Sequence, residues 1–88
     1  MEILNASTKT GVASDVSKLL KSYGYNVIKI SDSDKKLAET VIYDYSGGKK
    51  PYTTQFLANR FKAKVIEQPK DPTKKIDISV LLGENYHQ

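Results

Sequence analysis

Residues 2–27, EILNASTKTGVASDVSKLLKSYGYNV, predict a strand, a helix and a second strand. The apolar run at residues 3–6 is typical of a buried strand, and the polar turn after it is too hydrophilic to stay inside. A helix is expected from Thr10, a suitable N-cap, to about Tyr23, with Gly24 ending it in the left-handed conformation. Its predicted buried stripe consists of Val12, Val16, Leu19, Leu20 and Tyr23. The β-branched residues at 26–30 predict a strand parallel to the first, since so short a connection forms a right-handed crossover.

The rest of the chain predicts a weaker copy of this unit and one closing strand. Residues 40–45 predict a third strand, antiparallel to the second because nine residues, 31–39, are too few for a parallel crossover. Pro51 fits the first position of a second, slightly shorter helix. Its expected stripe is Tyr52, Phe56, Leu57 and Phe61. Brief strand character at 65–66 precedes a proline-containing loop, and the alternation over 76–82 predicts a last strand with one face on the core.

The order β-α-β-β-α-β-β predicts an α/β (α+β) fold. Two helices with apolar stripes must be buried against the same sheet, which favours a two-layer sandwich with both helices on one face of a mixed sheet. We expect one domain over residues 1–83 and a flexible tail at 84–88. The turn after the first strand and the loop at 31–39 should lie at one end of the sheet, with the Gly47-Gly48 turn at the other. The position of the last strand in the sheet does not follow from the order alone.

Composition narrows the class of protein. Eighty-eight residues with 39% apolar content suit one small domain, and the absence of cysteine excludes a disulfide framework and a thiolate metal site. No apolar run is long enough to span a bilayer, and no signal peptide is evident, so we expect a soluble chain without membrane contact of its own. The net charge of +4 comes from scattered lysines and a single arginine, which predicts a solvated basic surface and no nucleic-acid partner.

Groups for catalysis or metal binding are sparse. The single histidine, His87, is the second-last residue of the sequence, and no base is available to activate a serine such as Ser14. Asp32 and Asp34 lack the spacing of a calcium loop, and soft metal sites lack ligands. The sequence therefore predicts no enzyme activity, no cofactor and no metal.

The turn after the first strand falls where a phosphate-binding loop would lie. The G-x-G-x-x-G pattern would require glycine at positions 6, 8 and 11, but the chain has Ala6, Thr8 and Gly11. Asp32 mimics the acid that binds a ribose, yet a short hairpin from the second to the third strand argues against a doubly wound sheet. Nucleotide binding is therefore disfavoured.

Tyrosines offer a different possibility. Exposed tyrosines can stack on sugar rings or contact a peptide, and Tyr25, Tyr43, Tyr45 and Tyr52 are numerous for a chain of this size. Packing on helix stripes or on one face of a strand explains most of them better than ligand contact does. Both interpretations remain open at this point.

Several segments together resemble one protein family. The opening EILNASTKTGVA at 2–13 and LLKSYGYNV at 19–27 resemble the start of the LytR C-terminal domain family, V-x-V-L-N-G-T-G-x-x-G-L-A followed by L-x-x-x-G-F-x-V. TVIY at 40–43 is similar to the family's T-x-I-x-Y strand, and IDISVLLGENY at 76–86 to its terminal A-D-V-x-V-x-L-G-x-D-Y. The resemblance covers essentially the whole chain.

This resemblance implies a non-catalytic accessory module of a bacterial envelope protein of the LytR-CpsA-Psr type, working outside the cytoplasm as part of a larger membrane-anchored or exported protein. It implies structural roles for Asn5, Gly24 and Gly83, whereas Ala6 and Thr8 depart from the family glycines. The expected partner is cell-wall glycopolymer or peptidoglycan. The expected binding residues lie in two loops and are Asn5, Ser7, Lys9, Gly11, Asp32, Lys35 and Lys36. The alternative is protein–protein contact or self-association through a sheet edge or the loop at 68–75.

Overall fold

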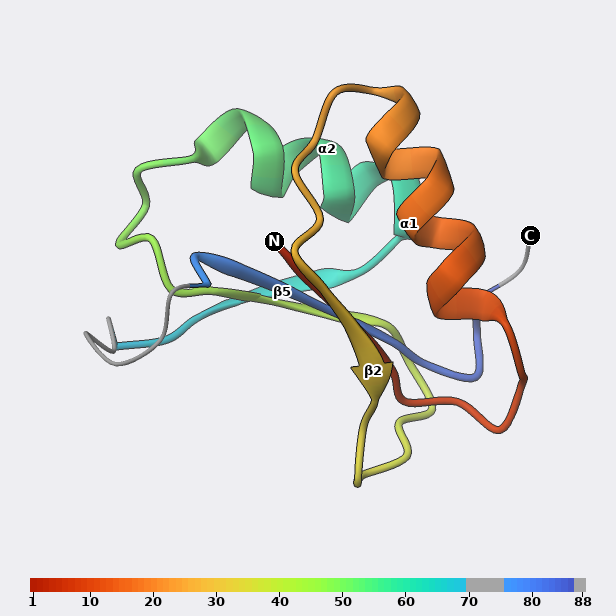
Figure 1. Ribbon diagram of the computed structural model, residues 1–88. Helices are drawn as coiled ribbons and strands as arrows, with labels where there is room; N and C mark the ends of the chain where they lie inside the picture. Colours follow the sequence, from red (N-terminus) through yellow and green to blue (C-terminus); the bar gives the residue numbers. More distant parts are fainter. Residues whose placement is uncertain (70–75, 87–88) are drawn as a thin grey trace.

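The computed structural model describes residues 1–69 and 76–86, which form seven elements around one core (Figure 1). In chain order these are β1 (Glu2–Asn5), α1 (Val12–Ser22), β2 (Lys29–Asp32), β3 (Val41–Asp44), α2 (Pro51–Phe61), β4 (Lys64–Glu67) and β5 (Ile78–Leu82). The predicted order is confirmed. The second strand begins at Lys29 rather than residue 26, and the last at Ile78 rather than residue 76. The two helices are equally long, at 11 residues each, so the expected difference in length was wrong.

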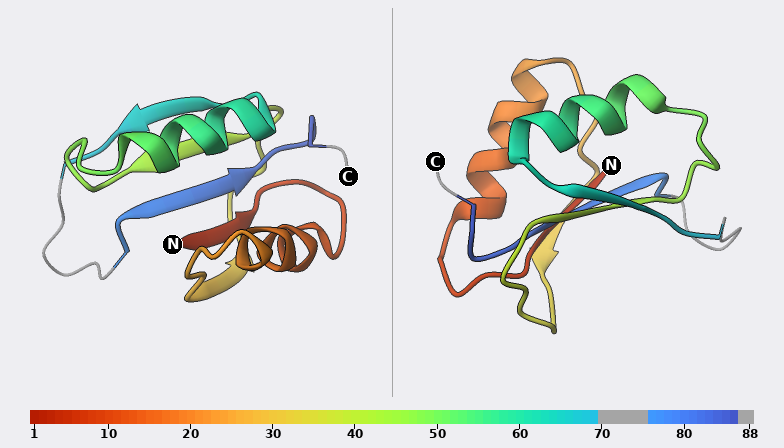
Figure 2. Two further views of the ribbon diagram at one scale, coloured as in Figure 1. Left: turned by 90° about the horizontal axis from the view of Figure 1, so that it is seen from above. Right: turned by 180° about the vertical axis from the view of Figure 1, so that it is seen from behind.

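The strands form one mixed sheet in the order β2-β1-β5-β3-β4. β1 pairs in parallel with β2 and β5, and β3 pairs in parallel with β4. A single antiparallel pair, β3 with β5, joins the two parallel groups at the centre. Both helices cover the same face of this sheet, as Figure 2 shows from above and from behind. The predicted two-layer fold with a mixed sheet is therefore confirmed.

The composition of the strands explains their positions. β5 (ISVLL) is buried along its whole length and lies in the centre, between β1 and β3. β2 (KISD) and β4 (KVIE) begin with lysine, end with an acid and form the edges, where charged side chains remain hydrated. The expectation that β5 buries only one face was wrong, because Ser79 and Leu81 on the second face are enclosed between the flanking strands.

The connection from β2 to β3 differs from the short hairpin expected. The two strands run in opposite directions, as predicted, but β1 and β5 lie between them. Residues 33–40 therefore pass along the ends of these strands to reach β3. Three strand spacings are about 14 Å, a distance that eight extended residues can span without a helix. A loop too short for a helical crossover was thus long enough to cross the sheet end.

Helix α1 begins one residue later than expected. Gly11, with φ 80°, is the N-cap in place of Thr10, and no side chain caps the helix. Its buried face comprises Val12, Ala13, Val16, Ser17 and Leu20. Leu19 is only half-buried and Tyr23 is 58% exposed, so the inward face lies toward the small residues and not toward Tyr23. Gly24 follows the C-cap with φ 89°, in the left-handed conformation predicted for it.

Helix α2 begins at Pro51, as predicted. Its buried residues are Thr54, Leu57 and Phe61, while Phe56 is half-buried. Tyr52 is 87% exposed, so its assignment to the buried stripe was wrong. Position 52 lies about 200° around the helix from position 54, which places its ring on the outer side. In the described part of the chain, no helix is long and apolar enough to cross a bilayer.

Candidate functional site

Three loops meet at the end of the sheet where β1, β2 and β5 finish. They are the turn after β1, residues 33–40, and the turn after β5. Backbone bonds join them: Ser33 N to Asn5 O at 2.9 Å, Leu37 N to Ala6 O at 2.7 Å, and Glu84 N to Leu37 O at 2.9 Å. This convergence of the first two loops was predicted from the sequence. The backbone bonds make the loop end a preorganised surface.

Asn5 organises the first of these turns. Its Oδ1 accepts hydrogen bonds from Ser7 N at 3.0 Å and Ser7 Oγ at 2.6 Å, and its Nδ2 donates to Lys9 O at 2.6 Å. Asn5 and Ser7 are both buried. The predicted structural role of Asn5 is thus present, and both side chains shape the turn from inside.

The β1–α1 turn is also bonded to the turn after β5. The Glu84 carboxylate accepts from the Thr8 amide and, at 3.1 Å, from the Thr8 hydroxyl. Lys9 Nζ donates to the carbonyls of Glu84 at 3.0 Å and Tyr86 at 2.7 Å. In a phosphate-binding loop, the backbone amide of Thr8 would have to bond the anion. Here this amide already donates to the Glu84 carboxylate of the same chain.

Thr40 and Asn85 join the remaining loop to the same turn. Asn85 Oδ1 accepts from Thr40 N at 2.8 Å and from Thr40 Oγ1 at 3.0 Å, and the threonine hydroxyl accepts from Gly83 N at 3.0 Å. The carbonyl side of the Asn85 amide is occupied by these bonds. Its Nδ2 is the side left for other contacts.

The outer residues of the predicted site are exposed. Gly11 lies at the start of α1, Asp32 at the end of β2, and Lys35 and Lys36 in the crossing loop. Asp32 is in register with Asn5 on the neighbouring strand, which brings the two predicted loops together. Among the seven predicted binding residues, these four present their surfaces to solvent, whereas Asn5 and Ser7 are enclosed and Lys9 is half-buried.

The structure adds a group of residues that sequence reasoning missed. Arg60, Phe61, Lys62, Asn85 and Tyr86 line a hollow of about 220 Å³. It forms because β4 runs parallel to β3, so α2 finishes at the same end of the sheet as β5. The single arginine of the chain was the only signal in the sequence that could have pointed to this hollow.

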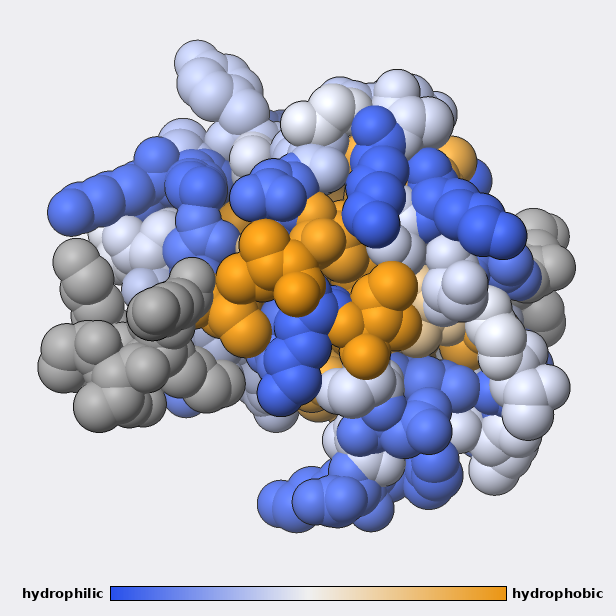
Figure 3. Space-filling model, in the orientation of Figure 1, coloured by the Kyte–Doolittle hydropathy of each residue, from blue (hydrophilic) through white to orange (hydrophobic). Residues whose placement is uncertain are grey.

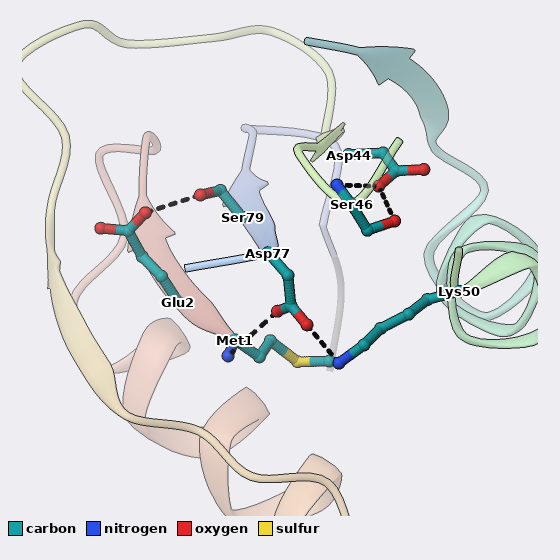
Figure 4. A network of polar contacts seen from close by, with 7 residues as sticks. All are labelled: Met1, Glu2, Asp44, Ser46, Lys50, Asp77 and Ser79. Carbon is teal, nitrogen blue, oxygen red and sulfur yellow. Dashed lines mark hydrogen bonds and ion pairs between the residues drawn. The ribbon is translucent and has the colours of Figure 1, made fainter. Parts of the chain in front are cut away.

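A polar network lies at the opposite end of the sheet (Figure 4). The Asp77 carboxylate contacts Lys50 Nζ and, at 3.8 Å, the amino group of Met1. Nearby, the Ser79 hydroxyl donates to Glu2 Oε2 at 2.6 Å, and Asp44 Oδ1 accepts from Ser46 N at 2.8 Å. Partial burial alone would raise the pKa of Asp77, but the hydrogen bond and charge of Lys50, together with the Met1 ammonium, lower that pKa below the ordinary aspartate value. The Lys50–Asp77 pair thus ties the start of α2 to the chain entering β5.

Because the folded-state pKa of Asp77 is lowered, its ion pair should stabilise the fold above the ordinary aspartate pKa of about 3.9 and lose this effect as the pH falls through the folded value. The carboxylate is about one-third exposed, so we expect a contribution of only about 0.5 kcal/mol at neutral pH. Urea unfolding of wild type and Asp77→Asn at pH 7 and pH 2.5 measures it. The difference between the two proteins should shrink on acidification, and a constant difference would contradict the assignment.

Some of the tyrosines considered as ligand platforms pack against other aromatic rings. Tyr25 lies 5.6 Å from Phe56, and Tyr43 lies 6.4 Å from Tyr45, centroid to centroid. Tyr52, by contrast, is exposed on α2. Within residues 1–69 and 76–86, no three histidine, cysteine or acidic side chains are grouped so that they could hold a metal ion.

A family model described as LytR cell envelope-related transcriptional attenuator, the LytR C-terminal domain, matches residues 1–86. The chain belongs to this family. This match confirms, over nearly the whole chain, the family resemblance of the opening, central and closing segments. A search of curated proteins and one of solved structures gave no match.

Membership places this LytR C-terminal domain among the accessory domains of cell-envelope proteins. Three positions of the family pattern have a visible structural basis here. Asn5 bonds its turn, Gly24 has a positive φ after α1, and Gly83 lies against the backbone at residues 39–40. At these three positions, contacts and backbone conformation within the fold explain the residue that the pattern requires.

Proposed function

We propose that this LytR C-terminal domain is a non-catalytic binding module that works outside the cytoplasm and contacts cell-wall polymer. The observation that carries the proposal is the loop end of the sheet, where loops joined by backbone hydrogen bonds carry exposed polar and cationic residues. A surface ordered in advance loses little conformational entropy on binding.

Charge supports an anionic polymer as the partner. The chain carries +4 overall, and Lys35 and Lys36 are exposed in the loop that crosses the sheet end. Such a surface attracts polyanions at low ionic strength, and salt screens the attraction. A wall glycopolymer with phosphate or carboxylate groups meets this requirement, and neutral peptidoglycan fragments meet it less well.

The test is an amide-resolved NMR titration with an anionic wall glycopolymer and, separately, with soluble peptidoglycan fragments, at low and moderate salt. We expect saturable shifts at Lys9, Asp32, Lys35 and their neighbours. An absence of shifts with either ligand at millimolar concentration would overturn the proposal.

The double variant Lys35→Gln/Lys36→Gln should weaken binding of the anionic polymer about three- to tenfold at low salt, because each exposed cation contributes up to about 1 kcal/mol. The dissociation constant from the same titration measures this effect. Lys18→Gln/Lys21→Gln, which removes two exposed cations from α1, is the matched control and should change affinity little. Equal weakening by both pairs would show that only net charge matters.

A second candidate function is self-association through the edge of the sheet. Ile28 is 53% exposed and Ile30, in edge strand β2, is 44% exposed. Figure 3 shows an orange patch over this edge, crossed by hydrophilic side chains. An edge strand presents unpaired backbone groups that a further strand can bond. The other predicted contact, the loop at 68–75, lies mostly outside the described residues.

Sedimentation separates the two candidates. Self-association through β2 would persist at high salt and would be lost in Ile30→Lys, whereas polymer binding would weaken with salt and survive this substitution. A monomer at millimolar concentration would exclude the second candidate.

A further inference from the structure

The hollow between the end of α2 and the turn after β5 is lined by hydrogen-bond donors and aromatic carbon. Arg60 and Lys62 contribute cations, and Asn85 and Tyr86 contribute an amide and a phenol. Within the part of the chain that the structure describes, none of the lining residues is acidic. A lining of this kind suits an anion and offers little to a cation.

Neighbouring contacts orient these donors. The Arg60 guanidinium lies 5.9 Å from the centre of the Phe61 ring, which favours a defined position for its planar fork. Asn85 directs its carbonyl oxygen to Thr40, which leaves its NH₂ group as the free side of the amide. Arg60 therefore offers the hollow a two-pronged cationic donor, and Asn85 offers it an amide donor.

The aromatic part of the hollow is also held in place. The Tyr86 ring packs against Phe61 at 5.7 Å, and the Tyr86 carbonyl accepts from Lys9 Nζ. Burial raises the pKa of the Tyr86 phenol; the Arg60 charge opposes this effect and the Asp15 charge adds to it. The phenol consequently stays protonated at neutral pH and can donate a hydrogen bond.

The two cations are available to a ligand. Among residues 1–69 and 76–86, the ion pairs within 4 Å involve Met1, Lys29 and Lys50, and not Arg60 or Lys62. Asp15, on α1, is close enough to act on Tyr86 but does not line the hollow. Among the described residues, no lining carboxylate neutralises the positive charge of the hollow.

We propose that this hollow binds a phosphate group carried on a polyol or sugar, as in a phosphodiester-linked wall polymer. The Arg60 fork contacts two phosphate oxygens, Lys62 adds charge, and the Asn85 amide reaches the phosphate or an adjoining hydroxyl. The Tyr86 and Phe61 rings contact the carbon face of the polyol or sugar. The assignment rests on the proposed function, because it names the group of the polymer that is recognised.

Size favours a phosphate with its carrier over a free ion. A volume of about 220 Å³ exceeds what a phosphate alone occupies and leaves room for a bound sugar or polyol unit beside it. The neighbouring loop with Lys35 and Lys36 would then meet the following units of the same polymer.

The test is an NMR titration of the 88-residue chain with glycerol phosphate, glucose 1-phosphate, inorganic phosphate, glucose and acetate. Both phosphate esters should shift the amides of residues 60–62 and 85–86 and bind at least threefold more tightly than inorganic phosphate. Glucose and acetate should leave these amides unchanged. Arg60→Gln should weaken glycerol phosphate at least tenfold, and Lys62→Gln about threefold.

The matched control is Lys64→Gln, which removes an exposed lysine two positions further along that does not line the hollow. Weakening by Lys64→Gln equal to that by Lys62→Gln would overturn the site, as would equal binding of acetate and glycerol phosphate. Polymer binding that is unchanged in Arg60→Gln would overturn the site but leave the proposed function standing. If the polymer does not bind the wild type at all, the proposed function fails independently of the phosphate esters.

Discussion

Substitution of Gly83 by alanine is expected to lower the free energy of unfolding by about 3 kcal/mol. An added Cβ would lie 2.3 Å from the carbonyl carbon of Glu39, 2.5 Å from its oxygen and 2.7 Å from Thr40 N. These are backbone atoms, so no side-chain rotation can relieve the overlap. The chain on each side is restrained as well, because Gly83 N bonds Thr40 Oγ1 and Asn85 bonds the Thr40 amide.

Urea unfolding of Gly83→Ala beside Gly47→Ala measures this cost. Gly47 has no neighbour within 4 Å of an added Cβ but a φ of 69°, so alanine there should cost only about 1 kcal/mol through backbone strain. Comparison of the two variants separates the cost of steric overlap at Gly83 from the cost of backbone strain at Gly47. If Gly83→Ala were no more destabilising than Gly47→Ala, the crossing loop would not be held against the strand end as described.

Asn5→Ala is expected to cost about 2–3 kcal/mol of unfolding free energy. The substitution removes three hydrogen bonds inside one buried turn and leaves Ser7 N and Lys9 O without their partner. Because Lys9 also bonds the turn after β5, loss of the Asn5 contacts should loosen two of the loops that form the proposed binding surface. The midpoint and slope of urea unfolding measure the effect.

Two controls test the origin of this effect. Ser7→Ala removes the bond that the hydroxyl donates to Asn5 Oδ1 and the bond that it accepts from Lys9 N, but keeps the bond from Ser7 N to Asn5 Oδ1, so it should cost about 1 kcal/mol. Asn5→Asp keeps the acceptor for Ser7 but loses the donor to Lys9 O and places a charge in a buried turn, so it should cost nearly as much as alanine. An Asn5→Ala variant as stable as wild type would contradict a structural role and favour direct ligand contact.

Part of the candidate site could be predicted from the sequence. Asn5, Ser7, Lys9 and Gly11 are close in the sequence, and the parallel pairing of β1 and β2 brings Asp32 beside Asn5 as predicted. Arg60 and Asn85 were not connected with these loops beforehand. Their place depends on where β5 enters the sheet, which the order of the elements alone did not determine.

The sequence also predicted only part of the buried face of each helix. Apolar spacing placed both helices correctly and identified Val12, Val16, Leu20, Leu57 and Phe61 as buried. It also assigned Tyr23 and Tyr52 to the buried faces, but both side chains are exposed in the structure. Spacing defines the axis of a stripe, but the rotation of a helix on its sheet depends on which small residues, such as Ala13 and Ser17, allow close approach.

By itself, the sequence determined the order of elements, the two amphipathic helices, the turn glycines and the family, because these depend on local propensity and short-range pattern. Only the tertiary structure decided that β5 lies between β1 and β3, that residues 33–40 cross the sheet end, and that Arg60, Lys62, Asn85 and Tyr86 share one hollow. These features arise from contacts between residues far apart in the chain. Their free energy depends on how the whole sheet packs, which no single stretch of sequence encodes.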